Sequence, residues 1–135
     1  MASLTKCRAP GAAALAKAEL SILLTDNIGI RKINRTWRKK NQPTDVLSFP
    51  LYNVNELKFL ADRAKQTSIE AWPMGDVIIS LERAVEQARE KKVRLQDEVR
   101  WLLVHGILHL LGYDHEISRK EARRMRRLER SLLTR

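Results

Sequence analysis

The stretch "GDVIISLERAVEQA" (75–88) decides the fold of this 135-residue chain, because it joins a buried strand directly to a helix. Three consecutive apolar residues at 77–79 are typical of a strand that is covered on both faces. Ser80 then stands where a helix N-cap is favoured. We predict a strand over 75–81 and a helix over about 81–92. The inward residues of this helix are predicted to be Leu81, Ala84, Val85 and Ala88.

The rest of the chain carries further strand and helix patterns. "ELSILLT" (19–25) and "DVLSFPL" (45–51) are typical of strands. Helices are predicted over about 28–40, at about 56–65 within the mixed, polar stretch 52–74, over 95–111 and over 118–133. Gly112 suits the end of the third helix, since glycine accepts the left-handed conformation that follows many helices. The strands are too few for a doubly wound sheet, so we expect an α+β fold, a small mixed β-sheet covered by helices.

The helix over 28–40 is bounded by clear signals. An Asp-Asn pair precedes it and can supply its N-cap, and "NQPTD" ends it because proline is poorly tolerated inside a helix. Ile30, Ile33 and Trp37 stand at helical spacing, so all three are predicted to face the core. The alternative for Trp37 is stacking on an unpaired base.

Length and composition are those of one globular domain. The chain is 44% hydrophobic and 31% charged, with no apolar run near the roughly 18 residues that a membrane span needs. We divide it into a variable N-terminal segment (1–18), which weakly resembles a targeting peptide or is a frayed terminus, and a single globular domain (19–135). One cysteine, Cys7, offers no disulfide within the chain, so a cytoplasmic location is expected.

A net charge of +10 points to a polyanionic partner, and nucleic acid is the commonest one for a small basic protein. "RKINRTWRKK" (31–40) holds six basic residues and no acidic one. The last eighteen residues hold eight basic and two acidic residues. The alternative is that both segments are solvated helix faces. Membrane binding is disfavoured, because bulky aromatic residues do not line an apolar face in either segment.

"HGILHLLGYDH" (105–115) contains all three histidines of the chain. His105 and His109 stand four residues apart on the predicted helix, so both rings can reach one point in space. Gly112 turns the chain, and His115 arrives from another direction. Either the three are core residues, or they bind one metal ion and leave a fourth position open, as in catalytic zinc sites.

Two neighbouring residues refine this hypothesis. Gly106 follows His105, so the H-E-x-x-H pattern of zinc proteases, with its general-base glutamate, is absent. Asp114 could orient a metal ligand through a hydrogen bond, or it could cap backbone amides in the turn.

Three segments together resemble the YbeY family of bacterial rRNA maturation factors, which are described as metal-dependent endoribonucleases. They are "HGILHLLGYDH", "PTDVLSFP" (43–50) and "GDVIIS" (75–80), and the likeness extends from about Leu20 to the tail. About eighteen Ala-rich residues stand where family members usually have a further strand and helix.

The resemblance implies specific roles and partners. It implies that His105, His109 and His115 bind one Zn²⁺ per chain and that Arg38, in "WRKKNQPTD", matches an arginine implicated in activity. We therefore assign catalytic roles to Arg38 and His105. Single-stranded rRNA is the implied substrate, and the ribosome or a small-subunit precursor and an assembly GTPase are the implied partners. Without the resemblance, Arg38 could not be distinguished from Arg35 or Lys39.

The leading hypothesis is a zinc-dependent, single-strand-selective endoribonuclease that acts in rRNA maturation and ribosome quality control. The alternative is an rRNA-binding ribosome-assembly factor whose metal site is mainly structural. A third possibility is a metal-dependent hydrolase of another substrate, such as a peptide. The missing glutamate and the +10 charge count against that third possibility.

Overall fold

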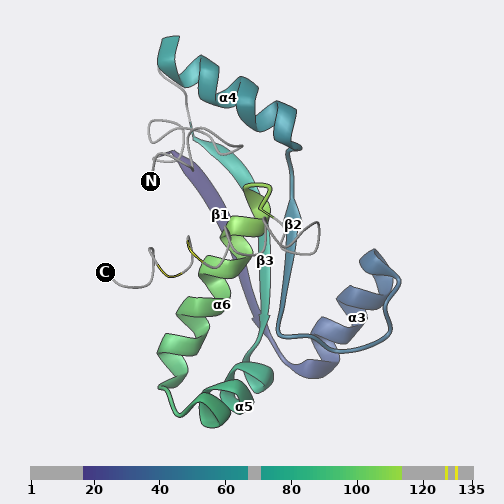
Figure 1. Ribbon diagram of the computed structural model, residues 1–135. Coiled ribbons are helices and arrows are strands. Elements are labelled where there is room, and N and C mark those ends of the chain that lie inside the picture. The colour runs from purple at the N-terminus through teal and green to yellow at the C-terminus, as the bar shows by residue number, and fades with distance from the viewer. Residues whose placement is uncertain (1–16, 67–70, 114–126, 128–129, 131–135) are drawn as a thin grey trace.

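The computed structural model describes residues 17–66, 71–113, 127 and 130 (Figure 1). Its elements, in chain order, are β1 (Ala18–Thr25), α3 (Asn27–Arg38), β2 (Val46–Pro50), α4 (Val54–Gln66), β3 (Trp72–Ser80), α5 (Leu81–Lys91) and α6 (Leu95–Leu110). The predicted helix over 118–133 lies outside the described residues, except for Arg127 and Arg130. Within the described part of the chain, every helix is too short or too polar to span a membrane.

The three strands form one mixed sheet in the order β1–β3–β2. β1 runs parallel to β3 and places Ile22 opposite Val77, while β2 runs antiparallel to β3 and places Ser48 opposite Val77. β3 is therefore the central strand, as its unbroken apolar run indicates. The α+β class with a small mixed sheet is confirmed.

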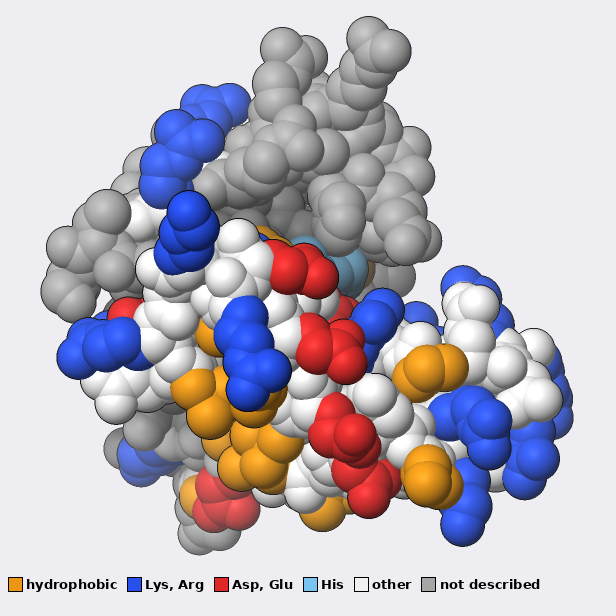
Figure 2. Space-filling model, turned by 90° about the horizontal axis from the view of Figure 1, so that it is seen from below, with side chains coloured by type: hydrophobic (Ala, Val, Ile, Leu, Met, Phe, Trp, Pro, Cys, Tyr) orange, Lys and Arg blue, Asp and Glu red, His pale blue; other side chains and the backbone are white. Residues whose placement is uncertain are grey.

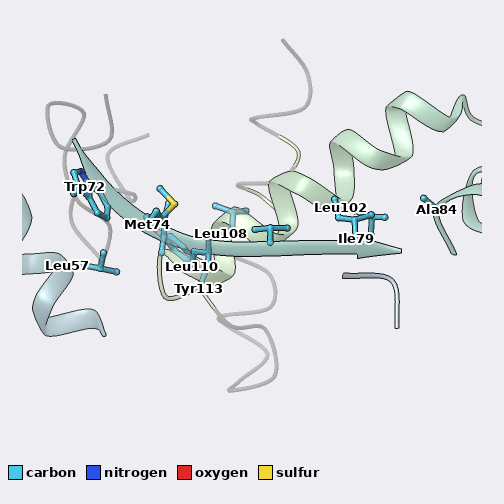
Figure 3. Packing of buried hydrophobic residues seen from close by; sticks show 11 residues of the cluster. Leu57, Trp72, Met74, Ile79, Ala84, Leu102, Leu108, Leu110 and Tyr113 are labelled. Carbon is cyan, nitrogen blue, oxygen red and sulfur yellow. The ribbon is translucent and has the colours of Figure 1, made fainter. Parts of the chain in front are cut away.

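Helices cover both faces of β3. Val77 and Ile79 point toward α6, and Ile78 points to the opposite face and packs on Ile30 of α3. Each of these buried side chains contributes about 1.5–3 kcal/mol by leaving water. Figure 3 shows the α6 side of this core, which follows β3 from Trp72 to Ile79 beside the leucines of α6. That cluster also includes Leu57, Met74, Leu102, Leu108, Leu110 and Tyr113.

Capping residues fix where the helices begin and end. The Asp26 carboxylate accepts a hydrogen bond from the Gly29 amide at 2.7 Å, and the Ser80 hydroxyl accepts one from the Arg83 amide at 3.3 Å. Both predicted N-caps are confirmed. Gly112, with φ of +95°, follows the end of α6 as predicted.

Leu81, which was predicted to face inward, is partly exposed, and so is Leu95 at the start of the next helix. Leu81 and Leu95 are 37% and 43% exposed, because each is the first residue of its helix and precedes the turns that contact the sheet.

α6 begins beside Arg94, whose guanidinium donates to the Asp97 carboxylate at 3.1 Å and lowers the pKa of that carboxyl. Both groups are exposed, so this pair contributes little to stability.

The start of β3 differs from the prediction. The strand begins at Trp72 rather than at Gly75, and the sequence did not reveal this because Pro73 interrupts the pattern. The Trp72 amide donates to Lys17 beside β1, so the Pro73 nitrogen faces the other side. β2 ends opposite Gly75 and does not extend to Pro73. No hydrogen bond between the strands is therefore lost because proline lacks an N–H.

The predicted core position of Trp37 is wrong. Ile30 is fully buried and Ile33 partly buried, but Trp37 is 72% exposed. Trp37 lies on the same side of the helix as Ile30 but about 10 Å farther along its axis. Figure 1 shows that α3 runs away from the sheet at the side of β2, so its last turn projects beyond the core.

The irregular register at Gly75 generates the first prediction. The pairing of β1 with β3 skips one residue between Pro73 and Gly75, and Gly75 has φ of +148°. A Cβ there would lie 2.5 Å from the Phe49 carbonyl oxygen, which belongs to the backbone and cannot turn away. We expect Gly75→Ala to lower the free energy of unfolding by about 1–3 kcal/mol in urea titrations. Asp76→Ala, an exposed neighbour, is the control, and equal stability of both variants would contradict this account.

Candidate active site

An open cleft of about 720 Å³ lies between the C-terminal half of α6, the strand β2 and the loop that joins α3 to β2. Its walls combine imidazole, guanidinium, ammonium and indole groups with the backbone of the edge strand. The residues that line it include Asn34, Arg38, Lys40, Gln42, Asp45, Ser48, Trp101, His105, His109, Gly112 and Tyr113. Most of the chemistry-bearing residues that the sequence singled out therefore meet in one place.

Two of the three predicted metal ligands converge in this cleft. The Nε2 atoms of His105 and His109 are 3.0 Å apart, and their ring centroids are separated by 4.6 Å. Because the residues are one helical turn apart, both rings leave α6 in nearly the same direction. The predicted convergence of these two imidazoles is confirmed.

The spacing of the two nitrogens suits a shared metal ion. Zinc–nitrogen bonds of about 2.0–2.1 Å at a tetrahedral angle place two nitrogen ligands about 3.3 Å apart. The 3.0 Å separation is close to this value. Among the described residues, no group of three histidine, cysteine, aspartate or glutamate side chains completes a metal site. His115 and Asp114 lie outside the described residues, so the three-histidine site stays a prediction.

The His105 ring stacks on the Trp101 ring. The two rings stack with centroids 5.4 Å apart and an angle of 22° between their planes. The Lys91 ammonium lies 4.0 Å from the Trp101 ring centroid and donates to Glu98 at 2.8 Å. Glu98 is only 1% exposed, so its carboxylate is a fixed anchor for this cation. The His105 ring is thus stacked on an indole whose neighbouring cation is anchored by the buried Glu98 carboxylate.

Gly106 lets α6 lie close to the sheet. A Cβ at this position would be 2.8 Å from a methyl group of Val77 and 3.1 Å from the Ser48 hydroxyl. The Ser48 hydroxyl donates to the Gly106 carbonyl at 3.1 Å. Position 106 therefore faces the sheet rather than the cleft. A glutamate there could not reach a bound substrate, which agrees with the absence of the zinc-protease pattern.

Arg38 reaches the same cleft from α3. Its Nη2 donates to the Ser48 carbonyl at 2.7 Å, and its guanidinium lies 5.4 Å from the centroid of the Phe49 ring. The bond uses one of the five N–H groups of the guanidinium. Ser48 consequently joins both halves of the site, since its carbonyl holds Arg38 and its hydroxyl holds the backbone next to His105.

Asp45 serves the fold rather than the cleft chemistry. Its carboxylate accepts from the Val46 amide at 2.7 Å and from the Gln87 side chain at 3.1 Å, and its carbonyl accepts from the Ser80 amide. These bonds tie the loop before β2 to β3 and α5. The motif "PTDVLSFP" thus forms one wall of the cleft and, through Asp45, attaches that wall to β3 and α5.

Comparison with known proteins agrees with this arrangement. A family model described as endoribonuclease YbeY matches residues 4–135. The chain belongs to the YbeY family. It is 50% identical over 111 residues to the endoribonuclease YbeY of Sulfurihydrogenibium sp., covering 82% of this chain and 65% of that protein. It is 45% identical over 121 residues to that of Aquifex aeolicus, covering 89% of this chain and 71% of that protein.

A solved structure also resembles this YbeY-family chain. The solution structure of TM1509 from Thermotoga maritima covers 90% of this chain and 71% of its own chain. The TM-score is 0.56 and the sequence identity is 25%. The resemblance stated from the sequence motifs is confirmed by the family model and by the named relatives.

Three cleft residues were missed by sequence reasoning. Asn34 is buried and its side-chain amide donates to the Gln42 carbonyl at 2.9 Å, which holds the loop that follows α3. Its signal was a polar residue four positions before Arg38 and beside the apolar side of the helix. Trp101 stands four positions before His105, and this spacing could have indicated the stack. Ser48 gave no signal, because its two roles depend on tertiary contacts.

The packing at Gly106 generates the second prediction. Gly106→Glu restores the H-E-x-x-H pattern but places a carboxylate against Val77, so we expect a loss of about 3 kcal/mol or more in unfolding free energy. No peptidase activity should appear on casein. Gln96→Glu, exposed on the same helix, controls for the added charge. A stable Gly106→Glu variant that cleaves casein would refute the assigned orientation of this position.

Proposed function

We propose that this chain is a zinc-dependent endoribonuclease that cleaves single-stranded regions of rRNA during rRNA maturation and ribosome quality control. Membership of the YbeY family supports RNA cleavage, since the named relatives are endoribonucleases. The single observation that carries the proposal is the 3.0 Å approach of two imidazole nitrogens in the cleft that Arg38 enters.

His105, His109 and His115 are the proposed ligands of one Zn²⁺. When bound, the ion would lower the pKa of a water molecule and polarise a phosphoryl oxygen. Neutral imidazoles leave the full charge of the ion available for this chemistry. The His105 ring is oriented by the stacked Trp101 ring.

Arg38 is proposed to stabilise the charge that builds on the phosphoryl oxygens. A guanidinium suits this role because its planar fork can donate two parallel hydrogen bonds to a phosphate. The bond to the Ser48 carbonyl fixes one edge of the fork before substrate binds. Such preorganisation reduces the cost of ordering a long side chain in the transition state.

The expected cellular context rests on the family resemblance. We propose the ribosome or a small-subunit precursor as the site of action, an assembly GTPase as a further partner, and the cytoplasm as the location. Positive charge on α3 supports the RNA part of this proposal, and Figure 2 shows lysine and arginine side chains gathered at that side of the molecule.

Removing one proposed ligand gives the third prediction. His109→Ala should remove bound zinc, from about one ion per chain to none, and abolish cleavage of an unstructured RNA while circular dichroism stays unchanged. The measurements are metal analysis of the purified protein and gel electrophoresis of the RNA. Gln96→Ala, an exposed residue on the same helix, should keep both metal and activity.

The outcomes separate the two functional hypotheses. Joint loss of zinc and cleavage in a folded variant supports the enzyme. An unfolded His109→Ala variant, or cleavage that persists without metal, would favour the assembly factor with a structural site. In that case Trp101→Leu, which loosens His105 without removing a nitrogen ligand, would lower stability and leave cleavage unchanged.

Arg38 gives the fourth prediction. Arg38→Ala should lower the cleavage rate by about 10²–10³-fold, as the loss of one preorganised donor does in other enzymes. Zinc affinity, measured by competition with a chromophoric chelator, should not change, because Arg38 contacts the backbone of β2 and not the histidines. Arg38→Lys should restore little of the cleavage rate, because an ammonium group lacks the planar fork of N–H donors.

Arg35→Ala is the matched control for charge. Arg35 is exposed on α3 and does not line the cleft, so its loss should weaken RNA binding without lowering the maximal rate. Equal rates for Arg38→Ala and Arg35→Ala at saturating RNA would show that Arg38 is an ordinary phosphate-docking cation.

A further inference from the structure

Trp37 stands out among the surface residues of the described chain. At 72% exposure it is the most exposed large apolar side chain in the described part of the chain. Leaving an indole in water forfeits the free energy that its burial would provide. Single exposed apolar residues are common, so exposure alone assigns no role.

The surroundings of Trp37 supply the second observation. It lies in "RKINRTWRKK" (31–40), where six cations and no anion occur within ten residues. Arg31, Lys32 and Arg35 are exposed on α3, as are Lys39 and Lys40 after its end. This charge complements a phosphate backbone, and it disfavours an apolar protein surface, which would have to remove nearby cations from water.

The position of Trp37 links this surface to the cleft. Asn34, Arg38 and Lys40 line the cleft, and they are three residues before, one after and three after Trp37. The helix end that carries the indole is also fixed, since the Lys40 amide donates to the Asn34 carbonyl at 3.2 Å and Asn34 is buried. The backbone that carries Trp37 is therefore fixed next to residues that line the cleft.

We propose that Trp37 is a stacking platform for one unpaired RNA base, next to the phosphate that Arg38 receives. Aromatic faces between cations are the usual means of holding single strands, because every base offers a π-face. A base within a duplex is stacked on its neighbours and cannot cover the indole. The inference deepens the proposed function, on which it rests, by assigning a residue that selects single strands.

The test combines a substitution at Trp37 of the 135-residue chain with a change in the RNA ligand. Affinity is measured by fluorescence anisotropy for a short labelled oligouridylate and for the same backbone made abasic. Trp37→Ala should weaken binding to the oligouridylate by about 5- to 100-fold. It should not change binding to the abasic strand or to a duplex of equal length. Trp37→Tyr should retain most of the affinity.

Two controls identify the source of any loss. Phe59→Ala removes another exposed aromatic ring, 60% exposed on α4, and should not alter RNA binding. Arg35→Gln should weaken all three RNA ligands and reduce the slope of affinity against salt by about 1, whereas Trp37→Ala should leave the slope unchanged.

The inference fails if Trp37→Ala binds the oligouridylate as the parent does, if its loss is equal on the abasic strand, or if the parent binds none of the RNAs. The first outcome would assign the exposed indole to a protein partner instead. Binding is scored separately from cleavage, so the two proposals can fail independently. If Trp37→Ala weakens binding as expected but the parent chain cleaves no RNA, only the endoribonuclease proposal fails. If the parent chain cleaves RNA and Trp37→Ala changes neither cleavage nor binding, only the stacking proposal fails.

Discussion

The close contact between Gly106 and the sheet is the constraint on which the site depends. With no side chain at 106, α6 approaches Val77 and accepts the Ser48 hydroxyl on its carbonyl. Successive residues of a helix are rotated by 100°, so once position 106 faces the sheet, His105 and His109 leave the helix together along its side. The cleft lies at that side. A larger residue at 106 would separate helix and sheet and would move both imidazoles away from β2.

Ser48 links this helix–sheet contact to Arg38 on the other side of the cleft. β2 is an edge strand, so one side of its backbone is not used by β3, and there the Ser48 carbonyl accepts from Arg38. The same residue contacts α6 through its hydroxyl. A guanidinium from α3 and two imidazoles from α6 are thus positioned by one short strand. The edge, which would otherwise expose unpaired backbone groups, is used to anchor a functional cation.

Sequence patterns predicted the features that depend on local periodicity. They failed where the environment of a residue depends on how far the neighbouring sheet extends. The strand before Ser80, its helix, and the convergence of His105 and His109 followed from spacing alone and are confirmed. Arg38 was selected only by family resemblance, because spacing cannot tell one cation in a basic run from another. Periodicity also gave the correct side of α3 for Trp37 but the wrong environment. It shows which way a side chain points and not where the neighbouring sheet ends.

That failure carries functional information. An apolar residue at position 37 gains little stability, since the described structure leaves 72% of the Trp37 side chain exposed. A lysine or glutamine there would suit an isolated helix end better, because both have higher helix propensity than tryptophan and no exposed ring. The fold therefore does not require an indole at this place, and a ligand that covers it would recover the burial free energy that the core does not provide. Bordered by cations and by the residues of the cleft, the indole is matched to a partner that offers flat apolar faces on a charged backbone, and an unpaired RNA strand has both.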